Sequence, residues 1–225
     1  MNSPETEIKK MWRICAVGPD STLELRGLWP RGIPRSKPPR TIHFSPEDYP
    51  SVEDRKVSFE TAAILMNEAG YNVYTVMNPL RSDFACRGAA KDADIRYRDL
   101  LLIDIDRVGD TSCPANETEL QAAKTLADRV RKFLTERGWP SPFVVMSGNG
   151  YHLYYVLNRL ENNEQSDQLI KQLLNNLSEI FDNGIVGIDT SVYNAGRITK
   201  IPGTLMRKGL ESADRPYRRS HVCDE

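Results

Sequence analysis

Apolar and polar positions are most regularly patterned between residues 99 and 205. Residues 99–106, DLLLIDID, are an apolar run that ends in two acids, and this pattern predicts a buried strand. Residues 143–147 and 151–157 predict two further strands, and the GNG between them is typical of a tight hairpin. Residues 197–202, RITKIP, predict the last strand of this unit.

Two amphipathic helices are expected between these strands. The helix at 115–138 begins with a capping pair and continues in one apolar stripe; the pair is Asn116 and Glu119, and the stripe is Leu120, Ala123, Leu126, Ala127, Val130 and Phe133. Residues 164–182 predict the second helix, whose apolar face is formed by Leu169, Leu173, Leu177 and Ile180.

The resulting order, β-α-β-β-α-β, predicts an α+β fold with a ferredoxin-like, or RRM-like, module. In such a module the first and third strands lie side by side in the centre of the sheet, the helices cover one face, and the other face is open. Residues 1–98 predict an additional N-terminal αβ module, with a helix from Ser58 to Gly70 and a strand at 71–77. We therefore expect two parts, 1–98 and 99–225, the second with a basic C-terminal segment.

Composition narrows the class of protein. The 225 residues are 40% hydrophobic and 27% charged, as in soluble globular proteins, and no apolar run is long enough to span a membrane. The start of the chain is too polar for a signal peptide. The four cysteines form no CxxC pair, so neither a zinc site nor a disulfide framework is expected, and a cytoplasmic protein fits best.

The net charge of −1 argues against a strongly basic nucleic-acid-binding protein, but the charge is unevenly distributed. Residues 26–40 hold five cations and no acid, and residues 197–219 hold seven cations and two acids. Such segments are typical either of solvated loops or of surfaces that follow a phosphate backbone.

Asp104 and Asp106 place two carboxylates at the end of a buried strand, where they repel each other and lose hydration. A favourable interaction is expected to offset this cost. Side chains alternate along a strand, so both aspartates are expected on one face, while Ile103 and Ile105 lie under the helices. Paired carboxylates suit a divalent cation with oxygen ligands. The alternative is that they are ordinary acids at an exposed strand end.

Other polar residues are candidates for the same face. His152 lies on the third strand, beside the first, and Ser147 and nearby glycine amides are possible phosphate donors. Asp189 either completes a cluster of three carboxylates or caps a short turn. Arg197, Lys200 and Lys208 either neutralise a triphosphate or only keep the surface soluble. Three acids, a Ser/His pair and several cations on one face favour two-metal phosphoryl transfer.

These motifs resemble those of the archaeo-eukaryotic primase superfamily, in particular the primase-polymerases of plasmids, phages and mobile elements. That family carries an hhhDhD strand, an SxH-type element and an hD element, and the chain has LLIDID, SGNGYH and GID in the same order. The middle motif is looser than SxH, since four residues separate Ser147 from His152. The longer SGNGYHL and NAGRITKIPGT resemble the plasmid and phage branch.

The resemblance implies a role for each matching residue. It implies that two Mg²⁺ or Mn²⁺ ions are bound by Asp104, Asp106 and Asp189. It implies that the incoming nucleotide is bound by Ser147, Gly148, Asn149, His152, Arg197 and Lys200. Weaker candidates for contacts in the site are Tyr193, Asn194 and Lys208 and, from the N-terminal module, Asn78 and Arg81, for which a plain loop role is the alternative.

The function implied is that of a DNA primase-polymerase catalytic core, formed by the two parts together. Its substrates would be NTPs or dNTPs, its partners a single-stranded DNA template and a primer strand, and its reaction nucleotidyl transfer in the replication of a plasmid, phage or mobile element. The family often fuses this core to a helicase or a helical primer-binding domain, so we expect a longer full-length protein.

Three other functions use a similar sheet. An RRM-like module that binds single-stranded nucleic acid would present Tyr151, Tyr154 and Tyr155 for base stacking. A nicking replication-initiator endonuclease would need a histidine pair, whereas the chain has only His43, His152 and His221. A nucleotide cyclase shares the two-metal chemistry but not the SGNGYH element.

Overall fold

A computed structural model describes residues 3–15, 17–34 and 36–223. Its larger sheet contains the predicted ferredoxin-like module, so the expected α+β fold is confirmed. The neighbouring strands of this sheet, in spatial order, are β11 (His221–Val222), β5 (Phe143–Met146), β6 (Tyr151–Glu161), β4 (Tyr97–Arg107) and β7 (Val186–Ile188). The first and third strands of the module, β4 and β6, pair antiparallel in the centre as expected.

The fourth strand of the module is not the one that the sequence predicts. It is β7, whereas residues 198–200 form β8 (Ile198–Lys200) and pair with β3 (Asn72–Val76) in the other sheet. Apolar periodicity shows that a segment is extended but not which sheet edge it joins. With three residues, β7 is also too short to carry a strand pattern.

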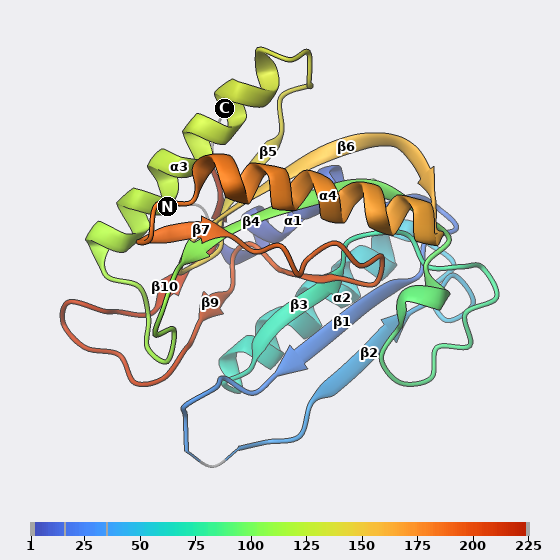
Figure 1. The fold of residues 1–225 in the computed structure, drawn as a ribbon. Coiled ribbons are helices and arrows are strands. Elements are labelled where there is room, and N and C mark those ends of the chain that lie inside the picture. Colours follow the sequence, from blue (N-terminus) through green and yellow to red (C-terminus); the bar gives the residue numbers. More distant parts are fainter. Residues whose placement is uncertain (1–2, 16, 35, 224–225) are drawn as a thin grey trace.

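Helices α3 (Glu117–Thr135) and α4 (Glu164–Phe181) cover the same face of this sheet (Figure 1). The predicted capping pair of α3 is confirmed: the Asn116 side chain accepts from the Glu119 N–H at 2.8 Å, and the Glu119 carboxylate accepts from the Asn116 N–H at 2.9 Å. The buried stripe of α3 follows the prediction except at its end, where Leu134 is buried and Phe133 only partly so.

The predicted apolar face of α4 is wrong. Leu169 and Ile180 are 59% and 54% exposed, and the buried face is formed instead by Ile170, Leu174, Leu177 and Phe181. The helix carries two apolar stripes one residue apart, and Leu177 fits both. Helical periodicity alone does not decide which stripe meets the sheet.

A second sheet, called the N-terminal sheet below, has the order β2 (Arg40–Phe44), β1 (Leu23–Leu28), β3 and β8; its first three strands come from the N-terminal residues. A separate core joins it to α1 (Pro4–Ile14) and α2 (Val52–Glu68). In Figure 1, β1 to β3 lie on the opposite side of the larger sheet from α3 and α4. The larger sheet therefore has helices on one side and the N-terminal sheet on the other (Figure 1).

The N-cap of helix α2 is Ser51 and not the predicted Ser58. Ser51 caps it by accepting from the Asp54 N–H, and Arg55 in its first turn is fully buried and donates to the backbone carbonyls of Pro19, Ser21 and Tyr49. A buried arginine interrupts the apolar pattern from which the start was predicted. Helix α1, capped by Ser3 and anchored by the fully buried Ile8 and Met11, was not predicted.

The C-terminal segment forms a separate ribbon and then returns to the larger sheet. Strands β9 (Leu205–Met206) and β10 (Arg218–Arg219) form a small ribbon, and β11 extends the larger sheet beside β5. A single 3₁₀ turn, η1 (Asp92–Asp94), lies in the expected loop before β4. None of the helices in the described ranges is long and apolar enough to cross a membrane. Cys15, Cys86 and Cys113 are free thiols.

Candidate active site

The two aspartates of β4 lie on the face away from the helices. Ile103 and Ile105 are fully buried in the main core, whereas the side chains of Asp104 and Asp106 keep 26% and 36% of their surface exposed. The alternation predicted from the sequence is therefore confirmed.

This face is not open as predicted, because the N-terminal sheet lies across from it. Between the sheets is a cleft of about 350 Å³. Eight of the sequence-predicted residues line it: Asp104, Asp106, Ser147, Asn149, His152, Arg197, Lys200 and Lys208. The N-terminal module contributes side chains that the sequence did not single out, among them Trp29, Arg31, Asn72 and Tyr74.

The charges around the two aspartates make them unequal. Burial disfavours the charged form of Asp104, but His152 and then Arg197 and Lys208 outweigh it and hold the pKa of Asp104 below its usual value. Burial, reinforced by the charge of Asp104, raises the pKa of Asp106. Two nitrogens lie close to these carboxylates: His152 Nε2, 3.4 Å from Asp104, and the ammonium Nζ of Lys208, 3.7 Å from Asp106. The pair is thus under-neutralised and suited to a cation with oxygen ligands.

Asp189 follows β7 directly and lies next to Asp104 across the strand pair, where its N–H donates to the Asp104 carbonyl at 2.8 Å. Its exposed side chain accepts from the Ser191 N–H at 2.8 Å, which is the turn role that the sequence left as the alternative. Asp189 does not line the cleft. Within the described ranges, no group of three or more Asp, Glu, His or Cys side chains is arranged to hold a metal ion.

The hairpin between β5 and β6 presents polar groups to the cleft. Ser147 closes the turn, since its N–H donates to the Gly150 carbonyl and its hydroxyl accepts from the Gly150 N–H. Gly148 has a φ of +112°, and a Cβ there would overlap the Met206 side chain, so glycine is required. Asn149 is 5% exposed and uses its Oδ1 for the Ala115 N–H, whereas its Nδ2 has no hydrogen-bond partner in the described structure.

The two cations near β8 differ from the surface cations that the sequence suggested as an alternative. Arg197 donates to the Ser191 carbonyl, and its buried Nε has no partner in the described structure. Lys200 is 2% exposed; its Nζ donates to the Leu205 carbonyl at 3.2 Å and lies 5.6 Å from the centre of the Tyr74 ring. Burial, with Arg207 and Arg219, lowers the pKa of Lys200 well below its usual value. These unpaired or uncompensated donors suit an anionic ligand.

The remaining candidates lie outside the cleft lining. Asn78 is buried and bridges the loop before β4, accepting from the N–H groups of residues 99 and 100. Arg81 is exposed and pairs with Asp83, and Asn194 donates to Asp92. The Tyr193 carbonyl accepts from buried Arg98. The contacts of these side chains and backbones are those of structural loop residues.

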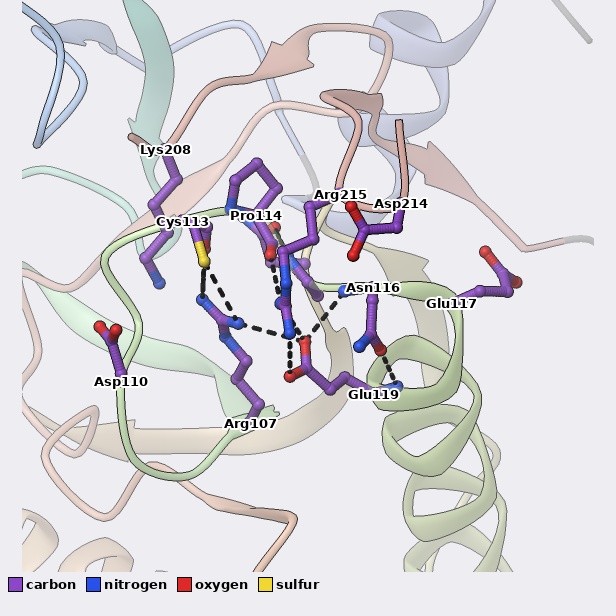
Figure 2. Close-up of polar contacts among 12 residues, drawn as sticks. Arg107, Asp110, Cys113, Pro114, Asn116, Glu117, Glu119, Lys208, Asp214 and Arg215 are labelled. Atoms are coloured by element: carbon purple, nitrogen blue, oxygen red, sulfur yellow. Dashed lines mark hydrogen bonds and ion pairs between the residues drawn. The ribbon is translucent and has the colours of Figure 1, made fainter. Parts of the chain in front are cut away.

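Charged groups next to β4 hold the C-terminal segment in place (Figure 2). Glu119 at the start of α3 accepts from Arg215 through both of its oxygens, at 2.7 and 2.9 Å, and from Arg107 at 3.1 Å. The Arg215 hydrogen bonds lower the pKa of Glu119 to about 2. Arg107 directly follows Asp106, and Arg215 lies on the same C-terminal segment as Lys208. The cluster therefore fixes the segment that brings Lys208 to Asp106.

Similarity to known proteins is found in structure and not in sequence. No protein-family profile and no curated protein match the chain. The fold is that of archaeo-eukaryotic primase (AEP) domains. The chain is similar to the AEP domain of the cyanophage S-2L primase-polymerase, with a TM-score of 0.55 and 17% identity over 97% of this chain and 89% of that one. It is also similar to the polymerase domain of Mycobacterium tuberculosis Ligase D, solved in complex with DNA, with a TM-score of 0.51 and 15% identity over 95% of this chain and 80% of that one.

Proposed function

We propose that the chain is the catalytic core of a DNA primase-polymerase that transfers nucleotides by two-metal chemistry. The observation that carries this proposal is that one cleft combines the Asp104–Asp106 pair with three donors that lack an anionic partner in the described part of the chain: Asn149 Nδ2, Arg197 Nε and Lys200 Nζ. The divalent cations of a bound nucleoside triphosphate would neutralise the carboxylates, and its phosphates would accept hydrogen bonds from the three donors. The AEP fold agrees with this interpretation.

The donor set fits Mg²⁺ or Mn²⁺, because carboxylate oxygens are the ligands that these ions prefer. Asp104 and Asp106 would hold the ions, and Asp189 would join them once its carboxylate leaves the Ser191 N–H. Bound ions would supply charge neutralisation and would activate the attacking hydroxyl.

The other polar residues bind and orient the nucleotide. Its phosphates are proposed to contact Ser147, Gly148, Asn149, His152, Arg197 and Lys200, with Lys208 nearby. This orientation places the α-phosphate near the aspartates, where a 3′-hydroxyl attacks it and pyrophosphate leaves. Because positioning and charge do most of the chemistry in phosphoryl transfer, no dedicated protein base is required.

DNA is proposed to approach along the rim of the cleft. Arg31 and Arg207, which line the cleft, come from the two basic segments noted in the sequence. These segments suit the template and primer backbones. A helicase or helical primer-binding domain elsewhere in a longer protein, a cytoplasmic location and a role in mobile-element replication remain parts of the same proposal.

The rival binding function is less well supported. Tyr154 and Tyr155 are fully buried and Tyr151 is 8% exposed, so none of the three is available for base stacking. The histidine pair that a nicking endonuclease needs is not formed by His43 and His152, because His43 contacts Glu24 and His152 contacts Asp104 at separate places.

Incubation with single-stranded DNA, labelled nucleotides and Mg²⁺ or Mn²⁺ tests the proposal. Products made without a primer indicate a primase, extension of a primer alone indicates a polymerase, and cut template indicates a nuclease. Asp104→Asn should abolish incorporation and leave the circular-dichroism spectrum unchanged. A mutant that extends primers as well as the parent would show that the metal assignment is wrong.

A further inference from the structure

Behind His152, two buried hydroxyl groups join the catalytic sheet to the N-terminal sheet. His152 Nδ1 lies 3.0 Å from the Tyr154 hydroxyl, which is hydrogen-bonded in turn to the Thr199 hydroxyl. Thr199 Oγ1 is also 3.4 Å from the same Nδ1. Tyr154 shares the cleft-facing side of β6 with His152, whereas Thr199 is on β8, so this chain of contacts crosses between the two sheets.

Because the three residues are buried, each of their polar hydrogens needs an acceptor within the protein. His152, Tyr154 and Thr199 are 7%, 0% and 1% exposed. In the described structure, the only acceptors within reach of the two hydroxyl hydrogens are the partner hydroxyl and Nδ1. A hydrogen on Nδ1 would leave one buried hydroxyl without an acceptor, which is costly.

Both hydroxyl hydrogens have acceptors when Nδ1 is an acceptor. Thr199 then donates to Tyr154 and Tyr154 to Nδ1, and the ring hydrogen lies on Nε2. Nε2 is 3.4 Å from Asp104 Oδ1 and faces the cleft. The hydroxyl groups of Tyr154 and Thr199 thus determine that the His152 ring donates toward the cleft from Nε2.

We propose that Tyr154 and Thr199 are positioning residues that hold His152 with Nδ1 as an acceptor and Nε2–H directed into the nucleotide cleft. This proposal rests on the proposed function for its kinetic consequence, but not for the orientation itself. Because Thr199 belongs to the N-terminal sheet, the orientation of His152 also depends on the position of that sheet relative to the larger one.

The chain offers a matched control for Tyr154→Phe. Tyr155 is the next residue on β6, is also fully buried, and has a hydroxyl without a hydrogen-bond partner in the described structure. It faces the helix side, against Trp139. Tyr155→Phe therefore removes the same atom from the same strand without touching His152. Thr199→Val removes the second hydroxyl, and Thr199→Ser retains it.

Nitrogen NMR of the imidazole groups tests the orientation without nucleotide or activity. The chain has three histidines, and loss of one signal set in His152→Gln assigns His152. The parent, Tyr155→Phe and Thr199→Ser should carry the hydrogen on Nε2, and Tyr154→Phe should show a mixture of the two tautomers. A Tyr154→Phe spectrum identical to that of Tyr155→Phe would overturn the proposal.

Steady-state kinetics of nucleotide incorporation test the kinetic consequence of this orientation. In Tyr154→Phe the KM for the incoming nucleotide should rise about tenfold, the worth of one hydrogen bond, with little change in kcat. Thr199→Val should raise it less, and Thr199→Ser should restore the parent value. An equal KM in Tyr154→Phe and Tyr155→Phe would contradict the proposal. If the parent itself incorporates no nucleotide, the proposed function fails, and the NMR result still decides the orientation.

Discussion

At the scale of single residues, the cleft is defined by buried donors that lack a hydrogen-bond partner in the described structure. Arg197 uses one terminal nitrogen for the Ser191 carbonyl, and its buried Nε has no partner among the described residues. Asn149 likewise commits its oxygen and leaves its Nδ2 without a partner in the described structure. Side chains in this state are already oriented, so a ligand gains their hydrogen bonds without ordering them.

We expect Arg197→Ala to weaken nucleotide binding more than template binding. A lost charge-assisted hydrogen bond is worth about 1.5–3 kcal/mol, so the nucleotide KM should rise about 10- to 100-fold. Arg81→Ala is the control, because Arg81 is exposed and pairs with Asp83 outside the cleft. Nucleotide titrations and filter binding of DNA measure the two affinities, and a larger loss of DNA affinity would assign Arg197 to the template.

Asp106→Asn should make the protein without metal more stable and inactive. Burial and Asp104 raise the pKa of Asp106, so its charged form opposes folding, and removal of the charge relieves this cost. Thermal unfolding in EDTA should show a higher midpoint for the variant. Added Mn²⁺ should raise the midpoint of the parent and not that of the variant. A variant less stable than the parent in EDTA would show that the two carboxylates do not repel each other significantly.

At the scale of secondary-structure elements, Glu119 connects the start of α3, the end of β4 and the C-terminal segment (Figure 2). Its pKa is lowered to about 2 from an ordinary value of 4.5. Its stabilising contribution is therefore complete above pH 4.5 and is lost as the pH falls toward about 2.

Glu119→Gln should remove this part of the acid dependence. The variant should be less stable at pH 7, because Arg107 and Arg215 lose a charged acceptor, and its stability should change less than that of the parent between pH 4.5 and 2. Glu136→Gln, at the exposed end of the same helix, is the control. Urea unfolding at several pH values measures both effects, and parallel curves for the parent and Glu119→Gln would contradict the assignment.

The elements that the sequence predicted well carry local information. The capping pair of α3 and the alternation along β4 depend only on neighbours in the chain, and both are confirmed. The edge joined by β8 depends on long-range pairing, and the start of α2 depends on a buried arginine bonded to distant carbonyls. For the same reason the sequence identified Lys200 as a candidate but not its burial, and it missed Tyr74 and Arg31.

At the scale of the whole molecule, the N-terminal sheet converts an exposed sheet face into a cleft. Residues 197–208 join the two sheets, since Arg197 and Lys208 face the aspartates while β8 between them belongs to the N-terminal sheet. Five cations of the two basic segments line this cleft, although the net charge is −1: Arg31, Arg197, Lys200, Arg207 and Lys208. Local charge thus explains how a nearly neutral chain can bind a polyanion.

DNA binding should consequently depend steeply on salt. Each phosphate contact contributes about −0.7 to the slope of log K against log salt concentration for a single strand. Arg31→Ala and Arg207→Ala should each make the slope shallower by about this amount, whereas Arg81→Ala should leave it unchanged. Fluorescence anisotropy over a series of salt concentrations gives the slopes, and identical slopes in all four proteins would remove these residues from the DNA path.

The account depends most on the claim that Asp104 and Asp106 hold divalent cations against a nucleoside triphosphate between the two sheets. A crystal structure with Mn²⁺ and a non-hydrolysable nucleotide, with data collected at the manganese absorption edge, tests it directly. The account predicts anomalous peaks within about 2.0–2.6 Å of oxygens from both aspartates, with the phosphates toward His152 and Arg197. Manganese and nucleotide bound elsewhere, with the cleft between β4 and β8 unchanged, would contradict it.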